Sequence, residues 1–309
     1  MDDSRLNPVN LSCITEISKM KLTGLTTILI PAAILFGCST GSSSSEKSQE
    51  ALTEEKTVHD IDQLLADMPP PSLVPFTLKS IGANFDQEHV NPLESASNYE
   101  GDTDKLALNM GVYASDISYL AAYGAEDECL SYLAKAHEMA ETLGEAGIYD
   151  QTHLDEFRGH VANGNEDEVA RLLSKLFMET SVQMEEDHHL TMAGLALTGS
   201  FIEGLYQAVI TLEKYDNSED SQRLLEPLVK IVLEEEQALL DIIQVLDDLP
   251  YDDTIGSLMI ELEILDRLYK GDLQEVEENM ANDPNYIVSK EVMRDITLEV
   301  KRIRGSIVE

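Results

Sequence analysis

Apolar residues recur at steps of three and four through most of the chain after residue 102. In Asp102–Tyr123, for example, Leu106, Met110, Ile117 and Leu120 share one face. This period is that of an amphipathic α-helix, and no run alternates with the period of two that a half-buried strand shows. The pattern predicts an all-α bundle of seven to nine helices. The expected helices are Asp102–Tyr123, Glu126–Leu143, Thr152–Ala162, Glu166–Glu186, His189–Tyr215, Ser218–Leu249, Thr254–Lys270, Leu273–Met280 and Val288–Ile303.

The residues before this domain follow other patterns. Residues 38–57 are rich in Ser and polar side chains, as in a flexible tether. Within residues 58–101, a short helix is expected at Val58–Met68, and Pro69-Pro70-Pro71 ends it. The remainder of that segment lacks sustained periodicity and contains several Pro, Gly and Asn residues. We therefore expect a loop-rich arm at 58–101 that packs on a helical domain at 102–309.

The N-terminal 37 residues have the features of a signal peptide. Lys21 precedes an apolar run from Leu22 to Phe36, and Leu35-Phe36-Gly37-Cys38 has the form of a bacterial lipobox. The run is short for a durable membrane span. We therefore expect cleavage before Cys38 and acylation of that residue, with two or three acyl chains anchoring the protein in the membrane. The alternative is an uncleaved N-terminal membrane helix, but the polar tether that follows argues against it.

Translation is expected to begin at Met20. Residues 1–19 are polar and acidic, which makes a poor start for a signal peptide, whereas Met20-Lys21-Leu22 opens a compact one. After cleavage, Ser39 follows Cys38 in place of an Asp, and nothing marks retention at an inner membrane. The expected location is the bacterial cell envelope, with a lipid anchor in the outer membrane and the domain facing the periplasm.

Charge narrows the range of partners. The 309 residues include 59 Asp and Glu but only 21 Lys and Arg, a formal net charge of −38, while 43% are hydrophobic. The hydrophobic share is enough for a real core, so the chain is not a disordered acidic tail. Phosphate backbones would be repelled by such a charge, which excludes nucleic acid as a partner. Electrostatic adhesion to anionic lipid is disfavoured for the same reason.

Two helical segments, LALNMGVYASDISYLAAY and LALTGSFIEGLYQAV, resemble a family of lipid-anchored helical proteins of Bacteroidetes-type bacteria. The resemblance covers roughly residues 69–249 and departs from the family at Phe201, where Trp is expected. It implies an envelope location and an all-α fold, and it implies no activity. The positions that carry it are Asn109, Gly111, Tyr113, Asp116 and Tyr119, then Gly199, Glu203 and Tyr206.

Polar side chains within these apolar helices are the candidate ligand-binding residues. Two such faces meeting inside a bundle form either a pocket for a small ligand or ion, or a buried network in which the groups satisfy one another and set the helix register. Both interpretations remain open from the sequence. The residues concerned are Asn109, Tyr113, Asp116, Tyr119, Glu203 and Tyr206.

A weaker signal for a divalent metal lies at Glu185, Glu186, His188 and His189, which contain two overlapping Glu-x-x-His spacings. Di-iron bundles carry such a motif on each of two helices, whereas here it occurs on one, near an expected helix junction. The alternative is a solvated acidic turn. No cofactor is predicted, although a divalent metal remains a possibility.

Motifs of the common enzyme classes are absent from the sequence. There is no phosphate-binding Gly-rich loop, no Gly-x-Ser-x-Gly and no His-Glu-x-x-His. This favours a lipid-anchored protein that binds a protein partner or small ligand over an enzyme. The alternatives are a metal-binding protein or metal-dependent enzyme that uses buried carboxylates, and a purely structural spacer of the envelope.

The lipid anchor yields a first testable prediction. Mass spectrometry of the mature N-terminus, from a host with the lipoprotein-processing enzymes, is expected to find Cys38 as the first residue, bearing a diacylglycerol group and an acylated amine. An unmodified Cys38 in such a host would refute the anchor.

Overall fold

The computed structural model describes residues 73–144, 151–163, 165, 168–169, 171–172, 187–215, 218–283, 286 and 290–309. These residues all fall in the second of two compact units of the chain, Lys47–Glu309. The predicted signal peptide, Cys38, the tether, the short helix at Val58–Met68 and most of the helix expected at Glu166–Glu186 lie outside the described residues.

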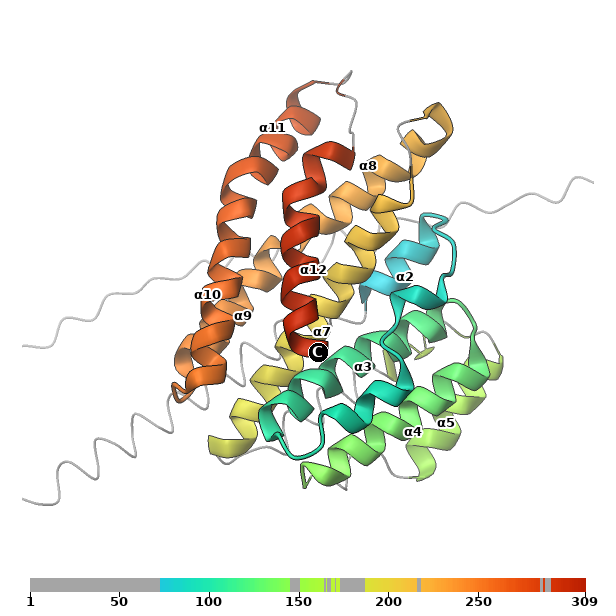
Figure 1. The fold of residues 1–309 in the computed structure, drawn as a ribbon. Helices are drawn as coiled ribbons and strands as arrows, with labels where there is room; N and C mark the ends of the chain where they lie inside the picture. Colours follow the sequence, from blue (N-terminus) through green and yellow to red (C-terminus); the bar gives the residue numbers. More distant parts are fainter. Residues whose placement is uncertain are drawn as a thin grey trace, which may run out of the picture. The chain divides into compact units, whose positions relative to one another are not determined.

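The all-α bundle is confirmed, since the described residues are mostly helical and contain no strand. The helices are α2 (Leu73–Ser80), α3 (Thr103–Ala122), α4 (Glu126–Thr142), α5 (Gln151–Ala162), α7 (Asp187–Glu213), α8 (Glu219–Glu234), α9 (Glu236–Asp248), α10 (Asp253–Leu268), α11 (Gln274–Asn282) and α12 (Arg294–Val308) (Figure 1).

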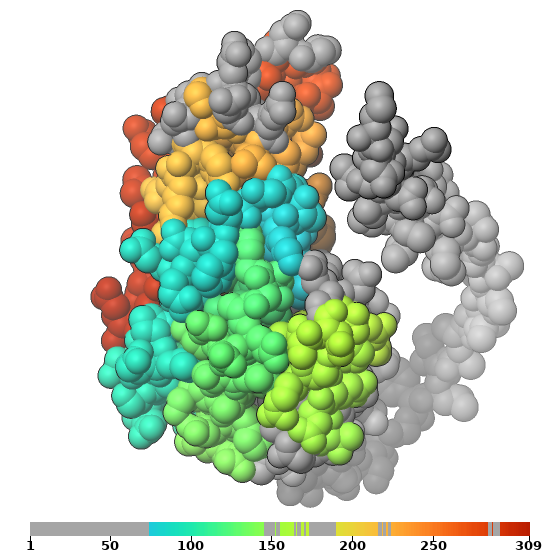
Figure 2. Space-filling model, turned by 90° about the vertical axis from the view of Figure 1, so that its right-hand side faces the viewer, coloured from blue at the N-terminus to red at the C-terminus, as the bar shows by residue number. Residues whose placement is uncertain are grey.

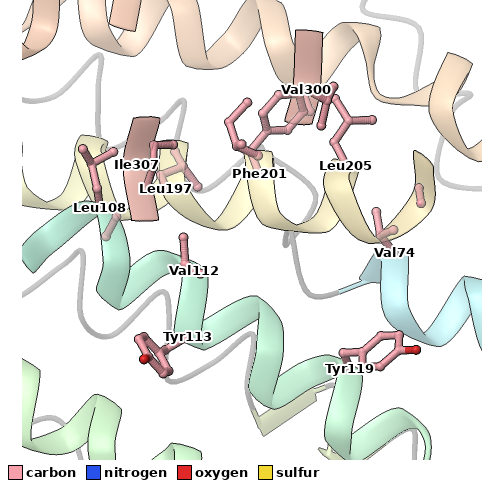
Figure 3. Close-up of a cluster of buried hydrophobic side chains, with 14 of the residues drawn as sticks. Val74, Leu108, Val112, Tyr113, Tyr119, Leu197, Phe201, Leu205, Val300 and Ile307 are labelled. Carbon is pink, nitrogen blue, oxygen red and sulfur yellow. The ribbon is translucent and has the colours of Figure 1, made fainter. Parts of the chain in front are cut away.

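Helices α3 and α7 form the centre of the bundle. Sixteen of the 20 residues of α3 are buried, so this helix has neighbours on nearly every side. Helices α2 and α4 pack on α3, while α8, α9 and α12 pack on α7. Figure 1 shows α4 and α5 next to each other beside α3, and α12 running alongside α10. The side chains between α3, α7 and α12 include Val112, Leu197, Phe201 and Val300 (Figure 3).

Two glycines bring the backbones of α3 and α7 into direct contact. A Cβ atom added to Gly199 would lie 1.9 Å from the carbonyl oxygen of Leu108, and one added to Gly111 would lie 1.7 Å from that of Ala196. Any larger residue at either position would therefore push the helices apart. Residue numbers rise together along the interface, because Leu108 faces Gly199 while Ser115 bonds Gln207, so the two helices run in the same direction.

Part of α7 is long and apolar enough to cross a membrane by length and composition. This window lies within Leu190–Glu213, and 89% of it is buried inside the protein. That burial is what the central helix of a folded domain shows, and it accounts for the apolar composition without a membrane.

The structure corrects several predicted helix boundaries. The helix expected at Ser218–Leu249 is two helices that break at Glu235, whereas Pro227 lies inside α8. The helices expected at Thr254–Lys270 and Leu273–Met280 are joined by a π-helical turn at Tyr269–Leu273. Such turns keep the chain helical through an extra residue, which apolar spacing alone does not reveal. The last helix begins later than expected, at Arg294, and extends to Val308.

The segment expected to be loop-rich contains more helix than its sequence pattern indicates. Leu73–Ser80 forms α2, and two 3-10 helices follow at Gln87–His89 and Leu93–Asn98. Val74 and Leu78 of α2 are buried against the bundle. At eight residues α2 is too short to be stable alone, so packing rather than intrinsic propensity accounts for it.

The glycine contact makes a testable prediction about stability. Replacing Gly199 by Ala is expected to lower the free energy of unfolding by at least about 2 kcal/mol, because the added methyl group meets backbone atoms that cannot move independently. Urea denaturation followed by circular dichroism measures the change, and loss of a cooperative transition would be the extreme form of the same result.

Gly305→Ala serves as the matched control. Gly305 also lies inside a helix, but a Cβ atom there meets nothing within 4 Å. This substitution is expected to raise stability by up to about 1 kcal/mol, since Ala favours helix over Gly. Equal effects of the two substitutions would contradict a tight α3–α7 contact.

Candidate functional site

Asp116 of α3 and Glu203 of α7 come together in the interior of the bundle. Both side chains are fully buried, and the Asp116 carboxyl lies within hydrogen-bonding reach of Glu203. The backbone N–H of Asn91 donates to Asp116 Oδ2 at 2.9 Å, and Gln207 Nε2 donates to Oδ1 at 3.2 Å. The structure thus brings together the two carboxylates that the sequence placed on separate apolar helices.

Glu203 is also held by a cation from the C-terminal helix. Arg304 of α12 donates from Nε to Glu203 Oε2 at 2.9 Å and from a terminal nitrogen to Oε1 at 3.1 Å. Its guanidinium group lies 4.4 Å from the centre of the Tyr206 ring, in a cation–π contact. A two-pronged pair of this kind is strong and directional, so it locks α12 onto α7.

The two carboxylates have different protonation states. Burial raises the pKa of Asp116 well above its usual range, and the negative charge of Glu203 raises it further. Burial also raises the pKa of Glu203, but the charge of Arg304 and its hydrogen bonds oppose that shift. We therefore assign the shared proton to Asp116, which donates it to an ionised Glu203 paired with Arg304. The net result is a buried cluster with no uncompensated charge.

The other candidate residues point elsewhere. Tyr113 lies on the side of α3 that faces away from α7, and Tyr119 lies near the C-terminal end of α3 (Figure 3). The Tyr113 hydroxyl donates to the Pro92 carbonyl at 2.6 Å. The Nδ2 atom of Asn109 donates to the carbonyl oxygens of Lys105 and Ile307, each at 2.9 Å. Tyr113 and Asn109 thus each bond the backbone, although the Oδ1 atom of Asn109 is buried without a hydrogen-bond partner among the described residues.

Tyr119 contacts a buried histidine that sequence reasoning did not single out. The Tyr119 hydroxyl lies 3.0 Å from His89 Nδ1 and accepts a hydrogen bond from the Asp86 backbone N–H at 2.9 Å. Burial, and then the nearby charge of Lys214, lower the pKa of His89 to about 4. The ring is therefore neutral at physiological pH, while burial raises the pKa of Tyr119 to about 12.

Together, tyrosine hydroxyls fasten the segment between α2 and α3 to the bundle. Besides Tyr113 and Tyr119, Tyr132 of α4 donates to the Asn91 carbonyl at 2.8 Å. Tyr99 accepts from Asn91 Nδ2 at 2.9 Å and donates to the carbonyl oxygen of Val308 at 3.2 Å. Residues 86–92 are thus tied to α3, α4 and the end of α12, which makes this irregular segment a fixed wall.

That wall borders an open pocket of about 430 Å³. One side consists of Gln87, Val90, Pro92, Leu93 and Glu94, and the other consists of α4 residues Asp127, Glu128, Ser131 and Tyr132. We call it the acidic pocket. Figure 2 shows the face of the molecule on which the segment 73–100 borders α3 and α4. The volume falls in the range of small-molecule sites, and the walls combine apolar surface with a few charged groups.

None of the six candidate ligand-binding residues lines the acidic pocket. The link is indirect, since Asn91 accepts from Tyr132 through its carbonyl and donates to Asp116 through its backbone N–H. Sequence reasoning also missed Arg304, Gln207 and Asn91. A signal existed for Arg304, a cation one residue from Ile303 on the apolar face of the last helix. Asn91 lies in irregular chain and gives no such signal.

The side chains suggested as a metal site lie outside the described part of the structure. Glu185 and Glu186 lie outside the described residues, and His188 and His189 fall in α7 with side chains outside them as well. Among the side chains that the structure does describe, no group of three or more His, Cys, Asp or Glu is arranged to hold a metal ion.

Comparison of this chain with protein-family models, with curated proteins and with solved structures found no match.

The assigned protonation states predict that amide substitution costs more stability at Glu203 than at Asp116. Glu203→Gln leaves the guanidinium of Arg304 without its anion and is expected to cost about 3 kcal/mol of unfolding free energy. Asp116→Asn keeps a neutral donor toward Glu203, and Gln207 can rotate its amide to match, so the expected cost is about 1 kcal/mol. Urea denaturation near neutral pH measures both.

Glu213→Gln is the control for this comparison. Glu213 also joins α7 to α12, through Lys301 at 3.0 Å, but both side chains are about 40% exposed. Its loss is expected to cost less than about 1 kcal/mol. An Asp116→Asn variant as unstable as Glu203→Gln would contradict a protonated Asp116.

Proposed function

We propose that the chain is a lipid-anchored binding protein of the bacterial cell envelope, held by acyl chains on Cys38, with the acidic pocket as its binding site. The anchor rests on the lipobox at Leu35–Cys38 and on the polar tether that follows it. The resemblance to lipid-anchored helical proteins supports the same location, with the domain facing the periplasm.

The observation that carries the binding role is the pocket beside a fastened wall. A wall fixed by buried tyrosine hydroxyls loses little entropy when a ligand binds, which favours affinity. The apolar side chains of Pro92, which is exposed, and Leu93, which is half-buried, offer surface that a ligand can shield from water. By contrast, the buried carboxylates already have protein partners.

The protein partners of the buried carboxylates separate this proposal from its alternatives. A metal held by Asp116 and Glu203 would have to displace Arg304, which engages both oxygens of Glu203. A purely structural spacer needs the buried network but does not need an open pocket. The absence of enzyme motifs in the sequence favours binding over catalysis. The acidic pocket is therefore the feature to test.

Filling the pocket is expected to abolish binding. Ser131 lines it and is exposed, so Ser131→Trp places an indole in the space without disturbing the core. The probes are 2-phenylethanol, phenethylammonium and phenylacetate, which share a phenyl group and differ in charge. Ligand-observed NMR on the full chain in nanodiscs of zwitterionic lipid, with empty nanodiscs subtracted, is expected to detect binding of at least one probe.

The expected effect of Ser131→Trp is a loss of at least about tenfold in affinity for that probe. Ala134→Trp is the matched control, because Ala134 is exposed on the same helix and does not line the pocket. Binding by none of the probes, or equal loss in both variants, would overturn the acidic pocket as the binding site.

A further inference from the structure

We infer that the acidic pocket selects a small organic cation with an apolar body, with its charged group between Glu94 and Glu128 and its apolar part against Pro92 and Leu93. This inference rests on the proposed function and names the class of ligand that the pocket takes. It follows from the distribution of charge around the pocket, from its apolar walls, and from the hydrogen bonds that hold its two sides together.

The pocket carries negative charge that no cation balances. Its lining includes Glu94, Asp127 and Glu128 but no Lys or Arg. Across the part of the chain that the structure describes, none of these three carboxylates takes part in an ion pair. A second pocket, of about 270 Å³, differs in this respect, since Arg294 lines it and pairs with Asp295 at 3.1 Å.

The carboxylates of the pocket come from both of its sides, Glu94 from one and Glu128 from the other. Burial raises the pKa of Tyr132, whose ring forms part of the lining, and the charges of Asp116, Glu94, Glu203 and Glu128 raise it further, in that order. Carboxylates from both sides therefore border one pocket, in which a cation gains more than it does in open solvent.

Helix capping explains only part of this charge. Glu126, Asp127 and Glu128 fill the first turn of α4, where acidic side chains stabilise the positive end of the helix dipole. Glu94, on the opposite side of the pocket, also lies in a first turn, but in a 3-10 helix of six residues, whose dipole is small. The first turn of α4 also supplies a control, because Glu126 lies in it and is exposed yet does not line the pocket.

The experiment compares phenethylammonium with 2-phenylethanol, which is nearly the same size and uncharged, on the full chain in zwitterionic nanodiscs. We expect the ammonium to bind about tenfold more tightly than the alcohol in 0.15 M salt. The double variant Glu94→Gln/Glu128→Gln is expected to reduce this preference to about twofold or less, mainly by weakening the binding of the ammonium. Glu126→Gln is expected to keep the preference.

Each outcome has a distinct meaning. If the alcohol binds as tightly as the ammonium and Ser131→Trp blocks both, the inference fails while the proposed function stands. If Glu126→Gln removes as much preference as the double variant, the selectivity comes from general surface charge and the inference fails. If neither probe responds to Ser131→Trp, the proposed function fails as well. A circular dichroism melt of each variant shows whether its fold is kept.

Discussion

The contact between the backbones of α3 and α7 is the constraint on which the rest of the structure depends. Gly111 and Gly199 allow each helix to reach the carbonyl groups of the other, and both helices run in the same direction through this contact. The register that results places Asp116 beside Glu203 and Gln207. A larger residue at either glycine would separate groups that are stable in the interior only because they meet.

The buried polar groups follow from this geometry as a linked set. Two carboxylates in close contact inside a protein cannot both be ionised at reasonable cost, so one keeps a proton and the other requires a cation. Arg304 supplies that cation from the end of the chain, and Asn91 supplies a backbone donor from the segment before α3. The network therefore joins the first and last described parts of the domain through its centre, and it fixes the segment that walls the acidic pocket.

Much of the fold was predictable because helical periodicity is a local property. The all-α class and most of the helices follow from apolar spacing alone, and Asp116 and Glu203 stood out as acidic residues in apolar helices. The break at Glu235 could not be predicted in the same way. Pro227 is the residue nearby that commonly interrupts a helix, and yet it lies within α8. Helix α2 could not be predicted from local sequence either, because it depends on burial of Val74 and Leu78 by distant residues.

The acidic pocket could not be predicted at all, since it is built from residues that have ordinary local explanations. Acidic residues at the start of α4 suit a helix N-terminus, and Glu94 lies in the first turn of the 3-10 helix Leu93–Asn98. Only the tertiary contacts of Asn91 and Pro92 with Tyr132 and Tyr113 bring the two sides together. A net charge of −38 first excluded anionic partners. The pocket gives that charge a more specific meaning, because three of its carboxylates surround an apolar surface where a cation would find both kinds of contact at once.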